Sequence, residues 1–124
     1  MILFIINCSK EKAQIPCLAK DMYKSKRFID NLCCADKPNS ECLILSGKYG
    51  LIKTSKKIEP YDVNLNLSSL DYRNKITKKI EVTLKKFIIK NKINEIHTDS
   101  KDSYYNAIKQ SLENINYSGK LKSI

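Results

Sequence analysis

Short apolar runs alternate along the chain with segments in which apolar residues recur at helical spacing. Residues 1–7, "MILFIIN", form an almost continuous apolar run. Runs of this kind are typical of strands that are buried on both faces of a parallel sheet. "CLILS" (42–46) and "INEIH" (93–97) predict a second and a third strand. Residues 117–124 leave open an additional edge strand.

Helices are predicted between and after these strands. The first covers residues 19–34, the second is long and is capped by Ser68 or Ser69, and the last is capped by Asp99 or Ser100. Their apolar stripes identify the faces that we expect to point inward. These inward positions are Met22, Phe28, Ile29 and Leu32, then Tyr72, Ile76, Ile80, Leu84, Phe87 and Ile88, and finally Tyr104, Ala107, Ile108 and Leu112.

This alternation of strands and helices predicts a small α/β sandwich with a mainly parallel sheet. Residues 51–67 are the exception, because Pro60 and the alternating "VNLNL" favour irregular structure. No repeat or linker divides the chain, so we expect residues 1–124 to form a single α/β domain.

The formal charge of +10 changes this picture, because a cation of this size attracts polyanions such as nucleic acid. Of the 23 basic residues, 21 are lysine, and Arg27 and Arg73 are the two arginines. Scarce arginine argues against sequence-specific readout of bases. The abundance of Lys, Ile and Asn is also typical of an AT-rich genome, so the basic face of the second helix is either a solvated surface or a phosphate-binding one.

Several classes of protein are not expected from this sequence. No apolar run approaches the ~20 residues of a membrane span, and the first apolar run lacks the features of a signal peptide. We therefore expect a cytoplasmic protein without membrane partners. The five cysteines include no CxxC pair, so neither a metal nor a cofactor is expected. The sequence does not indicate the oligomeric state.

Chemically capable residues follow each predicted strand. Cys8 and Ser9 follow the first, Ser46 ends the second and His97 ends the third. In open parallel sheets, ligands bind beyond the carboxyl ends of the strands. Each residue also has a structural alternative: Cys8 as an inert core thiol, for example, and His97 as a structural side chain. Lys12, close behind Ser9, is either a solvated lysine or a nucleophile or phosphate anchor.

Four motifs occur in a fixed order: "CSKEK" (8–12), "MYKSKRF" (22–28), "LSGKYGLI" (45–52) and "EPYDVNL" (59–65). The series resembles a family of small proteins of bacteria and their phages. It is similar, more distantly, to the catalytic domain of archaeosine synthase, which joins a lysine to a 7-deazaguanine nitrile. Those domains resemble the uracil-DNA glycosylase fold, a three-layer α/β/α sandwich that holds a base at the carboxyl ends of its strands.

The resemblance implies a base-sized pocket and marks the residues that would form it. They are Cys8, Ser9, Lys12, Tyr23, Ser25, Ser46, Gly50, Tyr61 and Asp62. Lys48, Tyr49 and Glu59 lie in the same motifs and, with His97, complete the candidate set. The water-activating Gly-Gln-Asp-Pro-Tyr motif of uracil-DNA glycosylases is absent, so the resemblance implies the pocket rather than that activity.

These observations predict an enzyme that acts on a nucleobase in nucleic acid or on a free modified base. The reaction would be glycosidic cleavage, base exchange or base modification. Lys12 is expected to meet the electron-rich base or a phosphate, and Asp62 the sugar cation or the nucleophile. Cys8 and Ser9 are expected beside them, and Tyr23, Tyr49 or Tyr61 could stack on the base.

Two other functions remain open at this point. One is a binding module for a modified base, a nucleotide or nucleic acid. The other is a small interaction protein whose pocket is vestigial. A cavity shared by Lys12 and Asp62 would favour catalysis, whereas their placement on different faces would favour the interaction protein.

Overall fold

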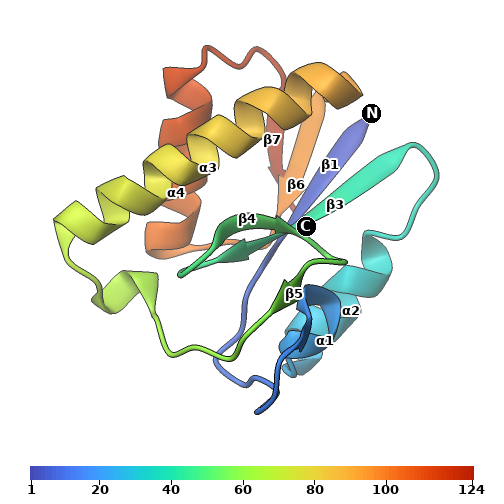
Figure 1. Ribbon diagram of the computed structural model, residues 1–124. Helices are drawn as coiled ribbons and strands as arrows, with labels where there is room; N and C mark the ends of the chain where they lie inside the picture. The colour runs from blue at the N-terminus through green and yellow to red at the C-terminus, as the bar shows by residue number, and fades with distance from the viewer.

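The computed structural model describes residues 1–124 and has a five-stranded sheet at its centre (Figure 1). The strands lie in the order β4 (Gly50–Lys53), β3 (Ser40–Ser46), β1 (Ile2–Asn7), β6 (Glu95–Thr98) and β7 (Lys120–Ser123). Only β4 is antiparallel to its neighbour. The three predicted strands and the mainly parallel α/β class are confirmed, and β7 is the additional edge strand.

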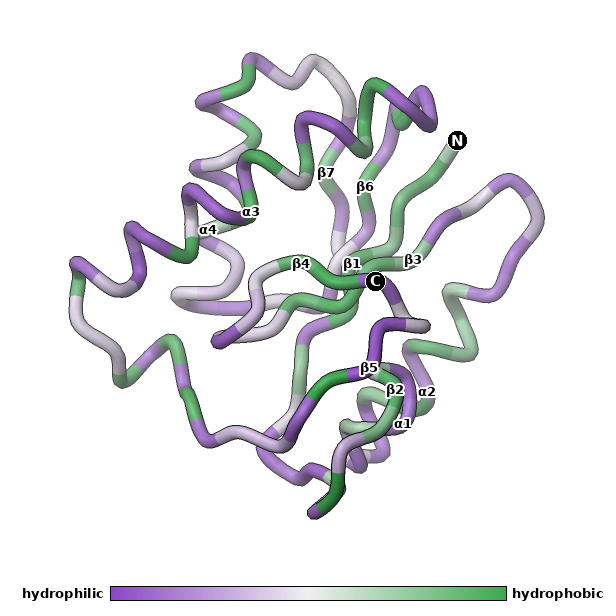
Figure 2. Tube along the Cα trace, viewed as in Figure 1, coloured by the Kyte–Doolittle hydropathy of each residue, from purple (hydrophilic) through white to green (hydrophobic).

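β1 lies in the middle of the sheet because its side chains are apolar on both faces. Leu3, Ile5 and Ile6 are all 0% exposed. Ile5 lies opposite Leu43 of β3 and opposite Thr98 of β6. Figure 2 shows the hydrophobic colour concentrated along β1 and β3. A strand with neighbours on both edges and helices on both faces has no solvent-facing side, which explains the absence of polar alternation.

Helices cover both faces of the sheet (Figure 1). α3 (Leu70–Asn91) and α4 (Asp102–Asn114) pack together on one face, and α1 (Ala19–Met22) and α2 (Lys26–Cys34) lie on the other. Ser69 caps α3 by accepting a hydrogen bond from the Tyr72 amide at 3.1 Å, as one of the two predicted caps.

The helix predicted over residues 19–34 is wrong as a single element, because the chain is extended between α1 and α2. Tyr23 pairs with Lys12 in an isolated antiparallel bridge. The Ala13 amide donates to the Met22 carbonyl at 2.7 Å, and the Lys24 amide to the Glu11 carbonyl at 2.9 Å. These bonds fix the segment that follows β1 against the end of α1 and the extended residues between α1 and α2.

Two further predictions are corrected. α4 is capped neither by Asp99 nor by Ser100; it begins at Asp102, whose φ of 54° is left-handed, and Lys101 at the cap position makes no side-chain bond. The segment 51–67 is not wholly irregular, because it contains most of β4 and two short elements. These elements are β5 (Lys57–Ile58), which pairs with β2 (Cys17–Leu18), and the 3-10 helix η1 (Leu65–Leu67).

The core is one cluster of 26 buried hydrophobic residues, drawn from the sheet and the inner faces of the helices. The inward stripes of α3 and α4 are confirmed at Ile76, Ile80 and Leu84 and at Ile108 and Leu112. Ile29 of α2 is 49% exposed, contrary to prediction. None of the helices combines the length and the apolar character that a membrane span requires.

Candidate functional site

A cleft of about 560 Å³ opens at the carboxyl ends of β1 and β6. The loop after β1, the segment 62–67 and the residues that lead into α4 form its walls. All four predicted catalytic residues line it: Cys8, Ser9, Lys12 and Asp62. Lys12 and Asp62 therefore face a common cavity, which is the arrangement that favours catalysis over a vestigial pocket.

Lys12 is held in place by its backbone and by an aromatic ring. Its bridge to Tyr23 fixes the main chain. Its ammonium nitrogen lies 4.7 Å from the centroid of the Tyr61 ring and 3.4 Å from the carbonyl oxygen of Lys10. A cation over a tyrosine face is stabilised by the ring quadrupole. Asp62, on the chain segment after Tyr61, is exposed at the cleft wall.

Cys8 and Ser9 continue the path of β1 and are only 7% exposed each. The Cys8 amide donates to the Leu45 carbonyl of β3 at 2.9 Å. The Ser9 hydroxyl donates to the Glu11 carbonyl at 2.8 Å and so turns the chain toward Lys12. Pairing with β3 thus continues as far as Cys8. The chain then turns toward Lys12 without a glycine or a proline, because the Ser9 hydroxyl closes the turn.

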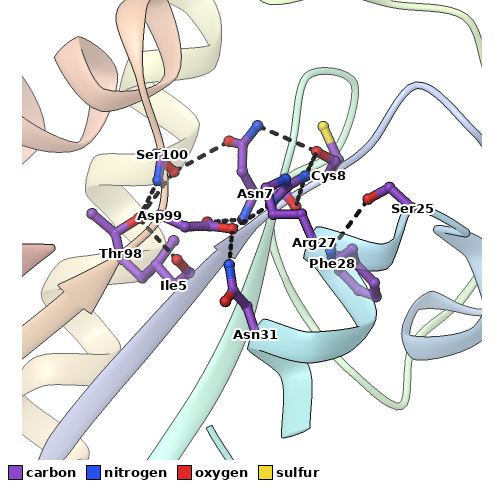
Figure 3. Close-up of polar contacts among 10 residues, drawn as sticks. All are labelled: Ile5, Asn7, Cys8, Ser25, Arg27, Phe28, Asn31, Thr98, Asp99 and Ser100. Carbon is purple, nitrogen blue, oxygen red and sulfur yellow. Dashed lines mark hydrogen bonds and ion pairs between the residues drawn. The ribbon is translucent and has the colours of Figure 1, made fainter. Parts of the chain in front are cut away.

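Asp99 is the centre of a polar network at the cleft wall (Figure 3). One of its carboxylate oxygens accepts a hydrogen bond from the backbone N–H of Asn7 at 2.7 Å. The other accepts from the side-chain amide of Asn31 at 2.8 Å and from the guanidinium group of Arg27. Arg27 also donates to the Cys8 carbonyl at 2.8 Å. The network joins β1, α2 and the end of β6, and it holds the start of the loop that carries Lys12.

A second set of bonds fixes the end of β6 behind this network (Figure 3). The Thr98 hydroxyl donates to the Ile5 carbonyl at 2.8 Å and lies 3.0 Å from the Ser100 hydroxyl. The Ser100 hydroxyl in turn lies 3.2 Å from the Asn7 amide oxygen. Thr98 and Ser100 are buried, so these bonds satisfy polar groups that have no access to water.

A chain of hydroxyl groups lies behind the wall that carries Lys12. The Tyr23 and Tyr61 hydroxyls are 2.6 Å apart, and Ser46 donates to Tyr61 at 2.8 Å. Burial raises the pKa of Tyr23 to about 12 and also raises the pKa of Tyr61. Both phenols are therefore neutral at pH 7. Tyr23 is 1% exposed, so its ring has no free face for a base.

Tyr104 lines the cleft from α4, with a hydroxyl that accepts from the Leu65 amide at 3.0 Å. Burial is the main cause that raises the pKa of the Tyr104 hydroxyl, and the nearby Cys8 raises it further. Tyr104 therefore joins α4 to η1 and to the loop after β1 as a neutral phenol.

Other predicted residues lie outside the cleft lining. Ser25 caps α2 by accepting from the Phe28 amide at 3.2 Å. His97 lies on β6, where its imidazole is 2.9 Å from the Glu95 carboxylate and packs edge-on against Phe4 with ring centroids 5.2 Å apart. The fold does not bring His97 to the cleft, because it precedes the end of its strand and points toward the face that carries Phe4.

Four residues of the predicted binding set lie on or beside β4 and β5. Lys48 is exposed and its ammonium group lies 5.2 Å from the centroid of the Tyr49 ring, which packs edge-on against Tyr61. Gly50 adopts a φ of 75°, which allows the chain to turn into β4. Glu59 is exposed and is absent from the ion pairs of the protein. None of these residues lines the cleft.

Sequence reasoning missed several residues that line the cleft. Asn7 and Asp99 were detectable in principle, because each ends or directly follows a strand. Arg27 lies within the "MYKSKRF" motif and is one of only two arginines. Asn64 likewise lies within the "EPYDVNL" motif, whereas Asn66 had no such signal, because it belongs to a segment whose path cannot be predicted from periodicity.

The cleft carries more charge than its own ion pair neutralises. Its lining contains the cations Lys10, Lys12, Arg27 and Lys101 and the carboxylates Asp62, Asp99 and Asp102. Arg27 and Asp99 form the only ion pair among them. Three lysines and two carboxylates thus remain to bind a polar or anionic ligand. No group of three or more His, Cys, Asp or Glu side chains in the protein is placed to hold a metal ion.

Comparison with known proteins gives one match. The model of a protein family described as a family of unknown function, DUF6884, matches residues 3–122, which is nearly the whole chain. No curated protein and no solved structure matches the chain.

Proposed function

The chain belongs to DUF6884, a family of unknown function, and we propose that its cleft is the active site of a nucleobase-directed enzyme. The substrate is a base in nucleic acid or a free modified base, and the reaction is glycosidic cleavage, base exchange or base modification. The observation that carries the proposal is that Lys12 and Asp62 line one cleft at the carboxyl edge of the sheet. Ligands bind at this edge in open α/β sheets.

A cation and a carboxylate in one cleft suit a reaction that separates charge. In glycosidic cleavage, the bond from C1′ of the sugar to the base nitrogen breaks, and its electron pair leaves with the base. Asp62 stabilises the positive charge on the sugar, and the ammonium group of Lys12 stabilises the departing base. Water then adds to C1′; one of its protons leaves by way of Asp62, and the base takes up a proton.

Side-chain amides at the cleft wall are suited to the edge of a base. The side-chain oxygen of Asn64 accepts from the backbone N–H of Asn66 at 2.9 Å, and the side-chain oxygen of Asn66 accepts from the backbone N–H of Ser103 at 3.0 Å. Their NH₂ groups make no hydrogen bond within the protein and can donate to acceptors on a base. Leu67, which is 85% exposed and lines the cleft, offers an apolar contact. This arrangement favours recognition by edges rather than stacking on Tyr23.

The same proposal includes the fold relationship. We propose that the chain is a three-layer α/β/α sandwich of the uracil-DNA glycosylase type, distantly similar to archaeosine synthase. The four sequence motifs, the helices on both faces and the position of the cleft support this relationship. An experimental structure with a modified base would test it, because in such folds the base occupies the carboxyl end of the sheet.

A binding module for a modified base, a nucleotide or nucleic acid is the second candidate. The exposure of Asp62 favours it, because solvent screens a carboxylate whose task is to stabilise charge. In this case the ligand binds through the three free lysines of the cleft, Lys10, Lys12 and Lys101, without being converted.

A thermal-shift screen of modified bases, nucleosides and short oligonucleotides tests the proposal. A ligand at 100 times its dissociation constant adds about 2.7 kcal/mol to the stability of the folded state. Hits are then assayed for turnover with Lys12→Met and Asp62→Asn. We expect the free energy of unfolding of each variant to stay within about 0.5 kcal/mol of the parent. The turnover rate should fall by a factor on the order of 10²–10³.

Lys24→Met and Asp71→Asn are matched controls, because both residues are exposed and lie outside the cleft lining. They should bind and react like the parent. If Lys12→Met and Asp62→Asn also do so, the cleft is not the active site. If both lose affinity and the parent shows no turnover, the protein is the binding module.

A further inference from the structure

Six lysines form a row along the exposed side of α3, and we call this surface the lysine row. Its members are Lys75, Lys78, Lys79, Lys85, Lys86 and Lys90, all of them exposed. Their successive spacings are 3, 1, 6, 1 and 4 positions, and at 3.6 residues per turn all six lie within about 140° of the helix circumference, on one side of the helix. The four ion pairs of the protein involve none of them.

The lysine row has no counterpart on α4, which packs beside α3. The exposed charged residues of α4 are Asp102, Lys109 and Glu113, which carry both signs. On α3, Glu81 is half-buried and accepts from Asn114 at 2.8 Å, so it does not interrupt the row. Like charges three or four positions apart destabilise a helix. The two carboxylates of α3, Asp71 and Glu81, precede Lys75 and Lys85 by four positions but form no ion pair with them, so six lysines face two acids on this helix. This excess of positive charge suits an anionic partner outside the protein.

The row begins close to the cleft. α3 follows η1, and Leu67 of η1 lines the cleft. In the first turn of α3, Arg73 donates to the Ser103 hydroxyl at 3.3 Å, next to the lining residue Asp102. Figure 1 shows α3 running from η1 across the sheet. From Lys75 to Lys90 the row spans about 22 Å at 1.5 Å per residue, roughly the length of six phosphates along one strand of a duplex.

We infer that the lysine row binds the phosphate backbone of a polynucleotide, one nucleotide of which occupies the cleft. This inference rests on the function proposed for the cleft, and it selects a nucleotide within a strand over a free base as the substrate. Lysine neutralises phosphate as a point charge and carries no fork for reading guanine. The backbone is therefore bound without regard to sequence, and selectivity is left to the cleft.

Fluorescence anisotropy with a labelled strand of about 20 nucleotides, roughly three times the length of the row, tests this inference. The row variant carries Lys78→Gln, Lys85→Gln and Lys86→Gln; the matched control carries Lys24→Gln, Lys57→Gln and Lys109→Gln at exposed sites off α3. At about 100 mM salt we expect the row variant to bind at least tenfold more weakly than the parent, and the control within about threefold. For the row variant, the slope of log affinity against log salt should become shallower by about 2 to 3 than that of the parent.

The outcomes separate this inference from the function proposed for the cleft. If the row variant and the control lose the same affinity for the strand, the inference that the lysine row binds phosphate is wrong, and the function proposed for the cleft is unaffected. The same conclusion follows if a base or nucleoside binds in an Asp62-dependent way while the strand does not bind. Row-dependent binding to phosphatidylserine vesicles but not to the strand assigns the row to a membrane surface. Strand binding that needs the row, together with turnover unaffected by Lys12→Met and Asp62→Asn, supports the row and counts against the cleft.

Discussion

Two hollows of similar size lie at opposite ends of the central sheet, and their linings differ in kind. The cleft at the carboxyl ends measures about 560 Å³, and the hollow at the amino ends of β6 and β7 measures about 490 Å³. Charged side chains make up nearly half of the cleft lining. In the amino-end hollow, Lys85 and Lys120 are the only charged residues, and isoleucines such as Ile93 and Ile115 form much of the wall.

The difference indicates what each end of the sheet is built for. At the amino end, close packing constrains the chain: a Cβ on Gly119 would approach the Asn94 carbonyl oxygen to 2.5 Å and overlap the Tyr117 ring. At the carboxyl end, five charged groups lie in a concavity without ion-pair partners. These five groups add no ion pair to the fold, and charged side chains that converge in a concavity are typical of a ligand-binding site.

The largest effect should come from the carboxylate that frames the cleft. Asp99→Ala leaves Arg27, Asn31 and the Asn7 amide without their shared acceptor. Removing one partner of a buried ion pair costs 3–5 kcal/mol. Because Arg27 is partly exposed, we expect about 3 kcal/mol from denaturant unfolding. Asp99→Asn, which keeps an acceptor, should lose less.

The exposed pair Lys26–Asp30 is the matched control for this prediction. Its side chains are 90% and 56% exposed, and the two groups lie 2.6 Å apart on α2. Asp30→Asn should change the free energy of unfolding by no more than about 0.5 kcal/mol. Equal losses for Asp99→Ala and Asp30→Asn would show that the Asp99 network does not hold the cleft together.

At the amino end, a substitution should alter stability and leave the cleft unaffected. Ile93 is 5% exposed and lines the amino-end hollow. Ile93→Ala should cost about 2 kcal/mol, the low end for such changes, because the existing hollow limits the packing that is lost. Ile93→Val should cost about 1 kcal/mol. Ligand affinity at the cleft should match the parent in both variants; a weakened affinity would mean that the two ends are coupled.

The contrast between the two ends also explains how much could be predicted from the sequence. The strands and the inward stripe of α3 were predictable, because burial imposes periods that can be recognised in "MILFIIN" or in Ile76, Ile80 and Leu84. The family resemblance assigned Lys12 and Asp62 to one pocket, while their placement on different faces remained the alternative until the fold placed both in the cleft lining.

The remaining features depend on tertiary contacts that leave no period in the sequence. Tyr23 breaks the predicted helix because it pairs with Lys12, a contact that no local pattern indicates. Asp99 fits a helix cap equally well until α2 brings Arg27 and Asn31 to it. Ser25 matches a binding motif and yet serves as a helix cap. Local sequence therefore identified segments that reach the cleft, 8–12, 59–65 and, through Arg27, 22–28, whereas the motif at 45–52 supplies no lining residue and the role of each side chain could not be predicted.

Two tyrosines, one near each end of the sheet, allow a comparison by pH. The pKa of Tyr23 is raised by burial to about 12 from 10.0, so the folded state retains this proton longer than the unfolded state does. The stability that the protonated Tyr23 contributes to the folded state is fully present below pH 10 and is lost as the pH rises toward 12. Between these values, Tyr23→Phe should weaken the pH dependence of unfolding by up to about 1.4 kcal/mol per pH unit.

Tyr117→Phe is the matched variant at the amino end, where the tyrosine hydroxyl is buried without a hydrogen-bond partner. Near pH 7, removing this hydroxyl should leave stability unchanged or raise it, whereas Tyr23→Phe should lower it by about 1 kcal/mol through the lost bond to Tyr61. Denaturant unfolding at pH 7 and pH 11 measures both effects. Identical behaviour of the two variants would contradict the assignment of the Tyr23–Tyr61 pair to the framework of the cleft.

The smallest expected effect concerns Ser25, which the sequence motifs assign to the binding site and the fold assigns to the start of α2. Its hydroxyl oxygen accepts from the Phe28 amide at 3.2 Å. Ser25→Ala should cost about 1 kcal/mol, the usual value of a lost cap, and Ser25→Asp should restore most of it, because a carboxylate accepts the same bond. Both variants should bind the cleft ligand with the affinity of the parent. A loss of affinity in Ser25→Asp at unchanged stability would place Ser25 among the ligand contacts and extend the site beyond the cleft toward α2.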